Sequence, residues 1–212
     1  MYKKTLKLLK AGGKTPKLLE GLKACYDPDF LLQGGALAPM MNSIHGKKVA
    51  GEVFREAACV IAEFVDPPIV APDPVAPFSD HGLRLINKKS SSFKGITRLY
   101  ELLSHDDPKT VAMTLRAFYG IVRSFVEHGI NTGEETQYRA KLNEVDQLLM
   151  GVSNAVIASK EFVEDDIEGE RPSKECAIRY GFRALHQLLL CGLGSKEVHV
   201  LFDFVPDLII GL

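Results

Sequence analysis

Residues 95–125 read GITRLYELLSHDDPKTVAMTLRAFYGIVRSF, two helical patterns separated by the polar tetrapeptide His105-Asp106-Asp107-Pro108. In each pattern the apolar residues recur at three- and four-residue steps, which places them on one helical stripe. Asp107 is a favoured N-cap, and Pro108 suits the first helical position, where an N–H would be unpaired anyway. The stretch therefore predicts a short helix, a sharp corner and a longer helix. The two stripes are Ile96, Leu99, Tyr100, Leu102 and Leu103, then Val111, Leu115, Phe118, Val122 and Phe125.

Helical patterns also dominate the rest of the chain, and they predict an all-α protein. Residues 49–65 and 173–190 each carry one apolar stripe. Five prolines within 66–80 and six acids within 161–170 interrupt the pattern, so we expect loops at 66–80 and 161–172. Between them, one long helix is expected from its apolar positions, which are Tyr138, Leu142, Val145, Leu149, Val152 and Val156.

The helix–corner–helix pattern of residues 95–125 recurs along the chain. Residues 35–65, GALAPMMNSIHGKKVAGEVFREAACVIAEFV, follow the same order of glycine, short apolar helix, polar corner and longer helix. A fainter copy combines residues 139–156 with residues 173–190, and FVPDLIIGL at 204–212 resembles the start of another. Because one helix pair cannot cover its own apolar face, such repeats stack and bury a continuous core.

This pattern resembles the armadillo and HEAT repeat families, in which the armadillo unit ends on a long third helix after a polar corner. The resemblance implies a right-handed α-α superhelix of three to four degenerate repeats, forming one domain over 1–212. The interval from Gly35 to Gly95 is longer than the usual repeat of about 40–47 residues, and the proline-rich loop accounts for the excess. The resemblance also implies a concave surface, made by the last helix of each repeat, that binds a segment of another protein.

The expected binding residues follow from positions on those last helices. In nuclear-import armadillo proteins, Trp and Asn recur four positions apart and bind a basic peptide. The matching pairs here are Cys59 with Glu63, Arg116 with Gly120, and Arg183 with Gln187, and the chain has no tryptophan. This absence argues against a basic peptide, and Arg116, Arg123 and Arg183 would suit an acidic segment, but the preferred interpretation is that they are ordinary surface arginines. The expected partner-binding residues are Glu63, Arg116, Arg123, Arg183 and Gln187.

The sequence contains no motif for catalysis, a cofactor or a metal. The six histidines are dispersed, and neither a nucleophile elbow nor a phosphate-binding loop is present. The four cysteines, at 25, 59, 176 and 191, lack metal-ligand spacing and lie in apolar helical patterns. They predict buried free thiols and a reduced, cytoplasmic location. The leading hypothesis is a non-catalytic scaffold or adaptor with no cofactor, which binds a partner through the concave helical surface or through a terminal stacking surface.

Two other hypotheses stay open. The net charge is −1, but the first 23 residues hold seven lysines and one acid, so the N-terminus could bind nucleic acid or an acidic membrane surface. No apolar run approaches the length of about 18–20 residues that a membrane span needs. Alternatively, an uncapped end of the stack would self-associate to a homo-oligomer. The residues expected to mediate that contact are Phe204, Leu208 and Ile209.

Overall fold

A computed structural model of the chain describes residues 2–10, 15–27, 30–31, 36–43, 50–67, 81–86, 95–130, 133, 135–143, 148–163 and 172–191. Helices account for most of these residues and none lies in a β-strand, which confirms the predicted all-α class. Phe204, Leu208, Ile209 and most of the two predicted loops fall outside the described ranges. None of the described helices combines the length and apolar character needed to cross a lipid bilayer.

Three of the helices, α5, α8 and α11, are longer than the others. In chain order the described elements are α1 (Tyr2–Lys10), α2 (Thr15–Lys23), the 3₁₀ turn η1 (Ala24–Tyr26), α4 (Leu37–Ser43), α5 (Gly51–Val65), α6 (His81–Ile86), α7 (Gly95–Leu102), α8 (Pro108–Ser124), the π-helical turn η2 (Phe125–Gly129), α9 (Glu135–Leu142), α10 (Leu148–Ser159) and α11 (Ser173–Leu190).

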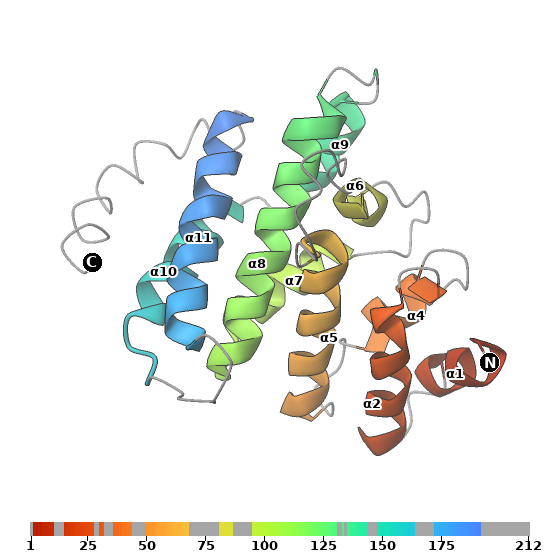
Figure 1. Ribbon diagram of the computed structural model, residues 1–212. Coiled ribbons are helices and arrows are strands. Elements are labelled where there is room, and N and C mark those ends of the chain that lie inside the picture. Colours follow the sequence, from red (N-terminus) through yellow and green to blue (C-terminus); the bar gives the residue numbers. More distant parts are fainter. Residues whose placement is uncertain are drawn as a thin grey trace, which may run out of the picture.

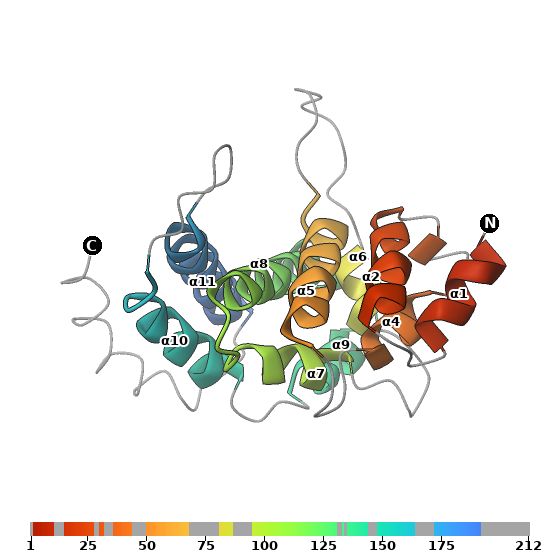
Figure 2. The same cartoon turned by 90° about the horizontal axis from the view of Figure 1, so that it is seen from below.

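The helices form two rows. α2, α5, α8 and α11 contact one another in that order and make one row (Figure 1). α4, α7 and α10 lie in the other row, where they pack against α5, α8 and α11 respectively (Figure 2). Each long helix therefore follows a shorter helix of the opposite row, as the repeat of residues 35–65 and 95–125 predicts.

α8 lies at the centre of this arrangement. It packs between α5 and α11 in its own row and also contacts α6, α7 and α10. The predicted stripe of α8 is buried throughout, with Leu115, Phe118 and Val122 fully inaccessible. Thr114 is also buried, and its hydroxyl donates to the Thr110 carbonyl at 2.7 Å, so it adds no unpaired polar group to the core.

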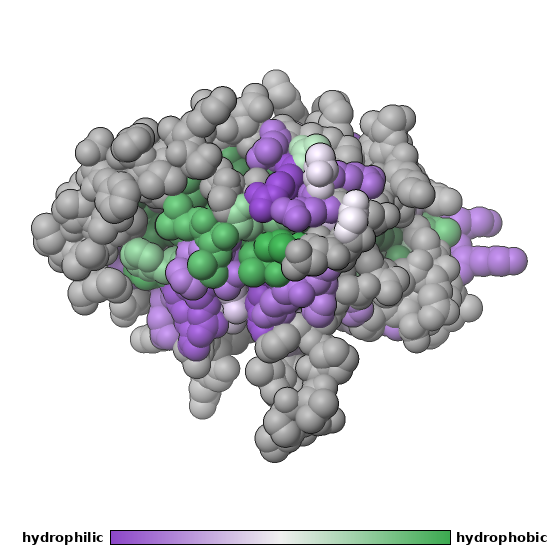
Figure 3. Space-filling view, turned by 90° about the horizontal axis from the view of Figure 1, so that it is seen from above, coloured by the Kyte–Doolittle hydropathy of each residue, from purple (hydrophilic) through white to green (hydrophobic). Residues whose placement is uncertain are grey.

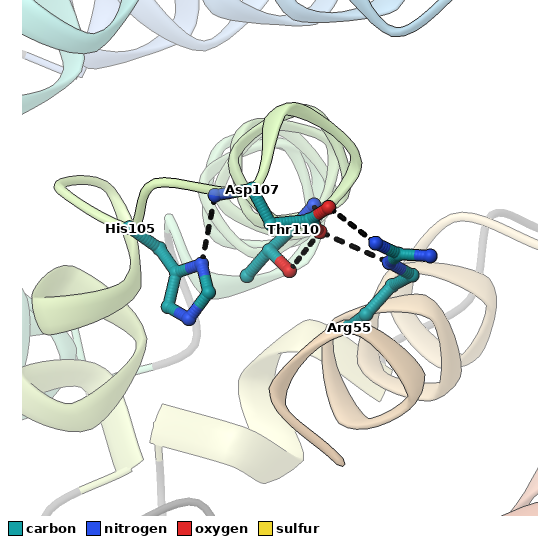
Figure 4. Close-up of polar contacts among 4 residues, drawn as sticks. All are labelled: Arg55, His105, Asp107 and Thr110. Carbon is teal, nitrogen blue, oxygen red and sulfur yellow. Dashed lines mark hydrogen bonds and ion pairs between the residues drawn. The ribbon is translucent and has the colours of Figure 1, made fainter. Parts of the chain in front are cut away.

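The corner before α8 has the predicted N-cap (Figure 4). Asp107 Oδ2 accepts from the Thr110 backbone N–H at 2.8 Å and from the Thr110 hydroxyl at 2.5 Å. The same carboxylate binds Arg55 of α5 through both oxygens, at 3.1 and 2.5 Å. His105 Nδ1 accepts the Asp107 backbone N–H at 3.0 Å and so fixes the turn. One carboxylate therefore caps α8 and attaches it to the start of α5.

At its other end α5 approaches α8 closely at Gly120. A Cβ atom on this residue would lie 2.9 Å from both the carbonyl carbon and the oxygen of Val65. Only glycine permits this backbone approach without a shift of the helix end. Because Arg55 meets Asp107 at the start of α8 and Val65 meets Gly120 near its end, the two helices run parallel.

The prediction of one long helix over residues 138–156 is wrong. α9 ends at Leu142, and the stripe continues on a separate helix, α10. Tyr138 packs edge-on against Phe125, whereas α10 packs on α11 and places Gly151 against the Tyr100 ring. The regular apolar spacing therefore belongs to two short helices that bury their apolar residues against different neighbours. Val145 lies outside the described ranges.

Candidate functional site

α8 leaves one narrow stripe open to solvent. Beyond its first turn, every residue of the helix is buried except Arg116, Tyr119 and Arg123. Their spacing of three and four residues places them on one face of the helix. The central helix therefore presents only arginine and tyrosine on its accessible side.

Two residues of α11 complete this surface. Tyr180 and Arg183 lie three positions apart, and the Tyr180 ring centroid is 6.0 Å from that of Tyr119. The Arg183 guanidinium carbon lies 5.7 Å from the Tyr119 centroid and 5.9 Å from the Tyr180 centroid. Arg116 lies 5.6 Å from Tyr180, and Arg123 lies 5.8 Å from Tyr119. We refer to these five residues as the Arg–Tyr cluster.

Two carboxylates neutralise two of the three arginines. Asp66, directly after α5, accepts from Arg116 Nε at 3.0 Å, and its backbone carbonyl accepts from Arg116 Nη2. Arg123 Nε donates to Glu127 at 2.9 Å, and Arg123 Nη1 lies 3.9 Å from Asp66. Burial alone would lower the pKa of Arg123, but the hydrogen bond to Glu127 and the neighbouring negative charges raise it above its ordinary value. Both guanidinium groups are therefore already paired.

Arg183 differs from the other two arginines. It is exposed, and no carboxylate among the described residues pairs with it. Its guanidinium is held over two tilted tyrosine rings, an arrangement that orients a cation without neutralising it. Within the Arg–Tyr cluster and its two described carboxylates, Asp66 and Glu127, one positive charge remains without a paired acid, and it is that of Arg183.

The predicted partner-binding residues do not all meet. Arg116, Arg123 and Arg183 lie together, and Gln187 follows Arg183 by one turn, with a buried amide oxygen that accepts no hydrogen bond from the described residues. Glu63, on α5, lies away from these residues. Burial raises the pKa of Tyr26 above its ordinary value, and the charges of Glu56 and Glu63 raise it further.

Gly120, which the sequence comparison with the import proteins pairs with Arg116, is not on the open surface, because Val65 covers it. Sequence analysis also missed Asp66, Tyr119 and Tyr180 as parts of the site. For the tyrosines a signal existed: RAFY at 116–119 and YGFR at 180–183 place Arg and Tyr three apart, in opposite order, on adjacent long helices.

The titratable groups elsewhere give no second site. The described residues contain no group of three or more His, Cys, Asp or Glu side chains that could hold a metal ion. None of the four cysteines forms a disulfide bond, and three are buried while Cys59 is half-buried. Burial raises the pKa of the Cys25 thiol to about 12, so this thiol stays protonated and unreactive at neutral pH.

Two other surface features stand out. Hydrophobic side chains gather in the view onto the ends of α8 and α11, bordered by hydrophilic ones (Figure 3). In the last turn of α11, Leu189 and Leu190 are 43% and 61% exposed. At the edge where α1 lies, hydrophilic side chains project from the molecule, and Lys3, Lys4 and Lys7 of this helix are exposed.

Comparison with known proteins does not assign this chain to a family. The chain matches no protein-family model, no curated protein and no solved structure. The functional interpretation therefore depends on the Arg–Tyr cluster and on the arrangement of the helices.

Proposed function

We propose that this chain is a non-catalytic adaptor that binds another protein through the open face of α8 and α11. The observation that carries the proposal is the composition of that face, which consists of three arginines and two tyrosines around the centre of the molecule. Tyrosine and arginine dominate the binding energy of protein interfaces, because they offer a large contact area together with directed hydrogen bonds.

We also propose that the helices form an armadillo-like superhelix. Support comes from the parallel α5 and α8, and from the second row that supplies one helix before each long one. A third helix precedes each of the later pairs, with α6 before α7 and α9 before α10. Three helices per unit favour the armadillo type over the two-helix HEAT type. In such a stack the Arg–Tyr cluster would lie on the concave surface.

A site-specific crosslinking experiment tests the adaptor function. A photoreactive phenylalanine analogue replaces Tyr119 or Tyr180, and the protein is irradiated in a native lysate of its source. We expect one and the same protein adduct from both positions. As a control, the analogue replaces Glu175, which is exposed near the start of α11 and outside the cluster. Adducts from position 175 but from neither tyrosine position would contradict the proposal.

A second candidate function is binding to an acidic surface through the N-terminus. The observation in its favour is that five lysines of α1 and α2 are exposed and form no hydrogen bond or ion pair with a described residue; they are Lys3, Lys4, Lys7, Lys17 and Lys23. Binding to RNA or to anionic vesicles that weakens steeply with added salt and is lost on replacing Lys3, Lys4 and Lys7 by Gln would support it. Salt-independent or absent binding would contradict it.

A further inference from the structure

We propose that the partner segment presents a single carboxylate to Arg183, next to an apolar or aromatic residue that packs on Tyr119 and Tyr180. This assignment rests on the proposed function and narrows it to one chemical class, a peptide with one acid in an apolar context. It differs from the polyacidic segment that three free arginines would favour.

The free donor capacity lies on Arg183. A guanidinium carries five N–H donors, and stacking on aromatic rings uses its face, not its edge. The Arg183 guanidinium carbon lies 5.7 and 5.9 Å from the Tyr119 and Tyr180 ring centroids, and no described carboxylate accepts from its N–H groups. A carboxylate can therefore bind there through two parallel hydrogen bonds, with the guanidinium already oriented.

The carboxylates already bound to Arg116 and Arg123 disfavour a second acid in the partner segment. Arg116 already binds Asp66 and Arg123 already binds Glu127, so an incoming carboxylate at either arginine would compete with a resident one for the same guanidinium. Both resident carboxylates also repel it at short range. A polyacidic segment gains one ion pair at Arg183 and meets repulsion at the next two positions, so additional acids add little affinity.

The two tyrosines determine which type of partner residue should lie beside the acid. Both rings are half-buried, and they are tilted by 42° to each other. Their accessible parts form an apolar surface next to the Arg183 guanidinium. A charged neighbour would lose hydration against this surface without gaining a partner, whereas an apolar or aromatic side chain gains buried area.

A peptide-display selection supplies the probe. Random dodecapeptides are selected on the immobilised full-length protein, and enriched peptides are synthesised with a fluorescent label for anisotropy titration. We expect the enriched peptides to share one Asp or Glu beside an apolar or aromatic residue. Replacing that acid by Gln or Asn, or replacing Arg183 by Glu, should weaken binding about tenfold or more, since hydrogen bonds between charged groups are the strong ones.

Two controls separate a specific contact from a general charge effect. Arg179→Glu makes the same charge change one turn earlier on the exposed side of α11 and should change affinity less than about threefold. Arg183→Glu should in turn bind the peptide whose acid is replaced by Lys better than wild type does. A purely structural role of Arg183 would not produce this reversal, and circular dichroism verifies that each variant is folded.

Three results would contradict the proposal, and each has a different meaning. If the peptides depend on Tyr119 or Tyr180 but not on their acid or on Arg183, the face binds peptides and the single-carboxylate assignment is wrong. If only a phosphoserine version binds, the site recognises phosphate instead. If no enriched peptide depends on Tyr119, Tyr180 or Arg183, the adaptor function at this face fails as well.

Discussion

α8 contacts its two neighbours, α5 and α11, through different kinds of interaction. On the α5 side, ion pairs lie at both ends of α5, Arg55 with Asp107 and Asp66 with Arg116, and its backbone meets α8 at Gly120, one turn beyond Arg116. On the α11 side, the cluster contacts are guanidinium and ring contacts, and α11 contributes a cation without an acid. The α5 side pairs its charges, whereas on the α11 side Arg183 pairs with no described carboxylate.

This difference separates structural from functional roles among residues of the same type. Arg55 and Arg116 each join α8 to residues of the neighbouring segment, so we assign them to the fold. Among the described residues, the contacts of Arg183 are with the rings of Tyr119 and Tyr180. Substitutions on the α5 side should therefore change stability, and substitutions on the α11 side should change binding.

The largest effect on stability is expected for Gly120→Val. A Cβ atom alone would approach the Val65 backbone to 2.9 Å, and a branched side chain cannot avoid it. Forcing extra atoms into such a contact typically costs about 1–3 kcal/mol, and backbone resistance places this variant near the upper value. Urea unfolding monitored by circular dichroism measures the loss.

Gly51→Ala is the matched control for that variant. Gly51 opens α5, and a Cβ atom there would meet nothing closer than the His105 ring at 3.9 Å. Alanine should leave stability unchanged or raise it by up to about 1 kcal/mol, as expected for Gly→Ala in a helix. If Gly120→Val were equally harmless, the close approach of α5 to α8 would be wrong.

The next largest effect is expected for Asp107→Ala, which removes the cap of α8 and the pair with Arg55. Loss of an N-cap costs about 0.5–2 kcal/mol, and the Thr110 hydroxyl also loses its acceptor, so we expect about 2 kcal/mol. Asp107→Asn keeps a good cap and should cost less than half as much. Equal losses for the two variants would assign the whole effect to the ion pair.

The pH dependence of stability provides a separate check of this corner. Burial by itself raises the pKa of Asp107, but hydrogen bonds from Arg55 and Thr110 outweigh it, and the net pKa lies below the ordinary value of 3.8. A lowered pKa in the folded state stabilises the protein above the unfolded-state pKa, and this contribution disappears as the pH falls through the folded value. Wild type should therefore lose part of its advantage over Asp107→Asn below about pH 4. A constant difference down to pH 2.5 would contradict this.

The corner and the buried stripes can be predicted from the sequence, but the ion pairs between helices cannot. Asp107 and Pro108 act through residues within one turn, so their roles follow from local rules. Asp66 reaches Arg116 only because the fold brings together positions 50 residues apart. The same holds for Gly120, because a glycine is needed there only through the close approach of the α5 backbone. The apolar spacing over 138–156 gave a wrong prediction because burial determines which residues are apolar and not whether the helix between them is continuous.

Asp66→Asn would make the α5 side resemble the α11 side. The variant leaves Arg116 and Arg123, whose side chains are 15% and 22% exposed, without the Asp66 charge. We expect a loss of about 1 kcal/mol in stability, as for a partly buried pair at the surface. The acidic peptide selected on wild type should bind a few-fold more tightly, and peptides with a second acid should gain most.

The result of Asp66→Asn is informative in both directions. If affinity for acidic peptides does not rise, the resident carboxylate does not compete with the partner, and the restriction to a single acid loses its basis. Anisotropy titration at two salt concentrations measures the gain, which should be larger at low salt because the added attraction is electrostatic.

The smallest effect on stability is expected for Arg183→Ala, although its effect on binding should be large. Arg183 is exposed and pairs with no described acid, so only its contacts with the two rings are lost. Exposed cation–π contacts contribute about 0.5–1 kcal/mol, and alanine recovers part of this through its higher helix propensity. The unfolding midpoint should therefore stay within error of wild type while affinity for the selected peptide falls. If instead the variant unfolds as easily as Gly120→Val does, then Arg183 holds α8 to α11, and the two sides of the central helix are both structural.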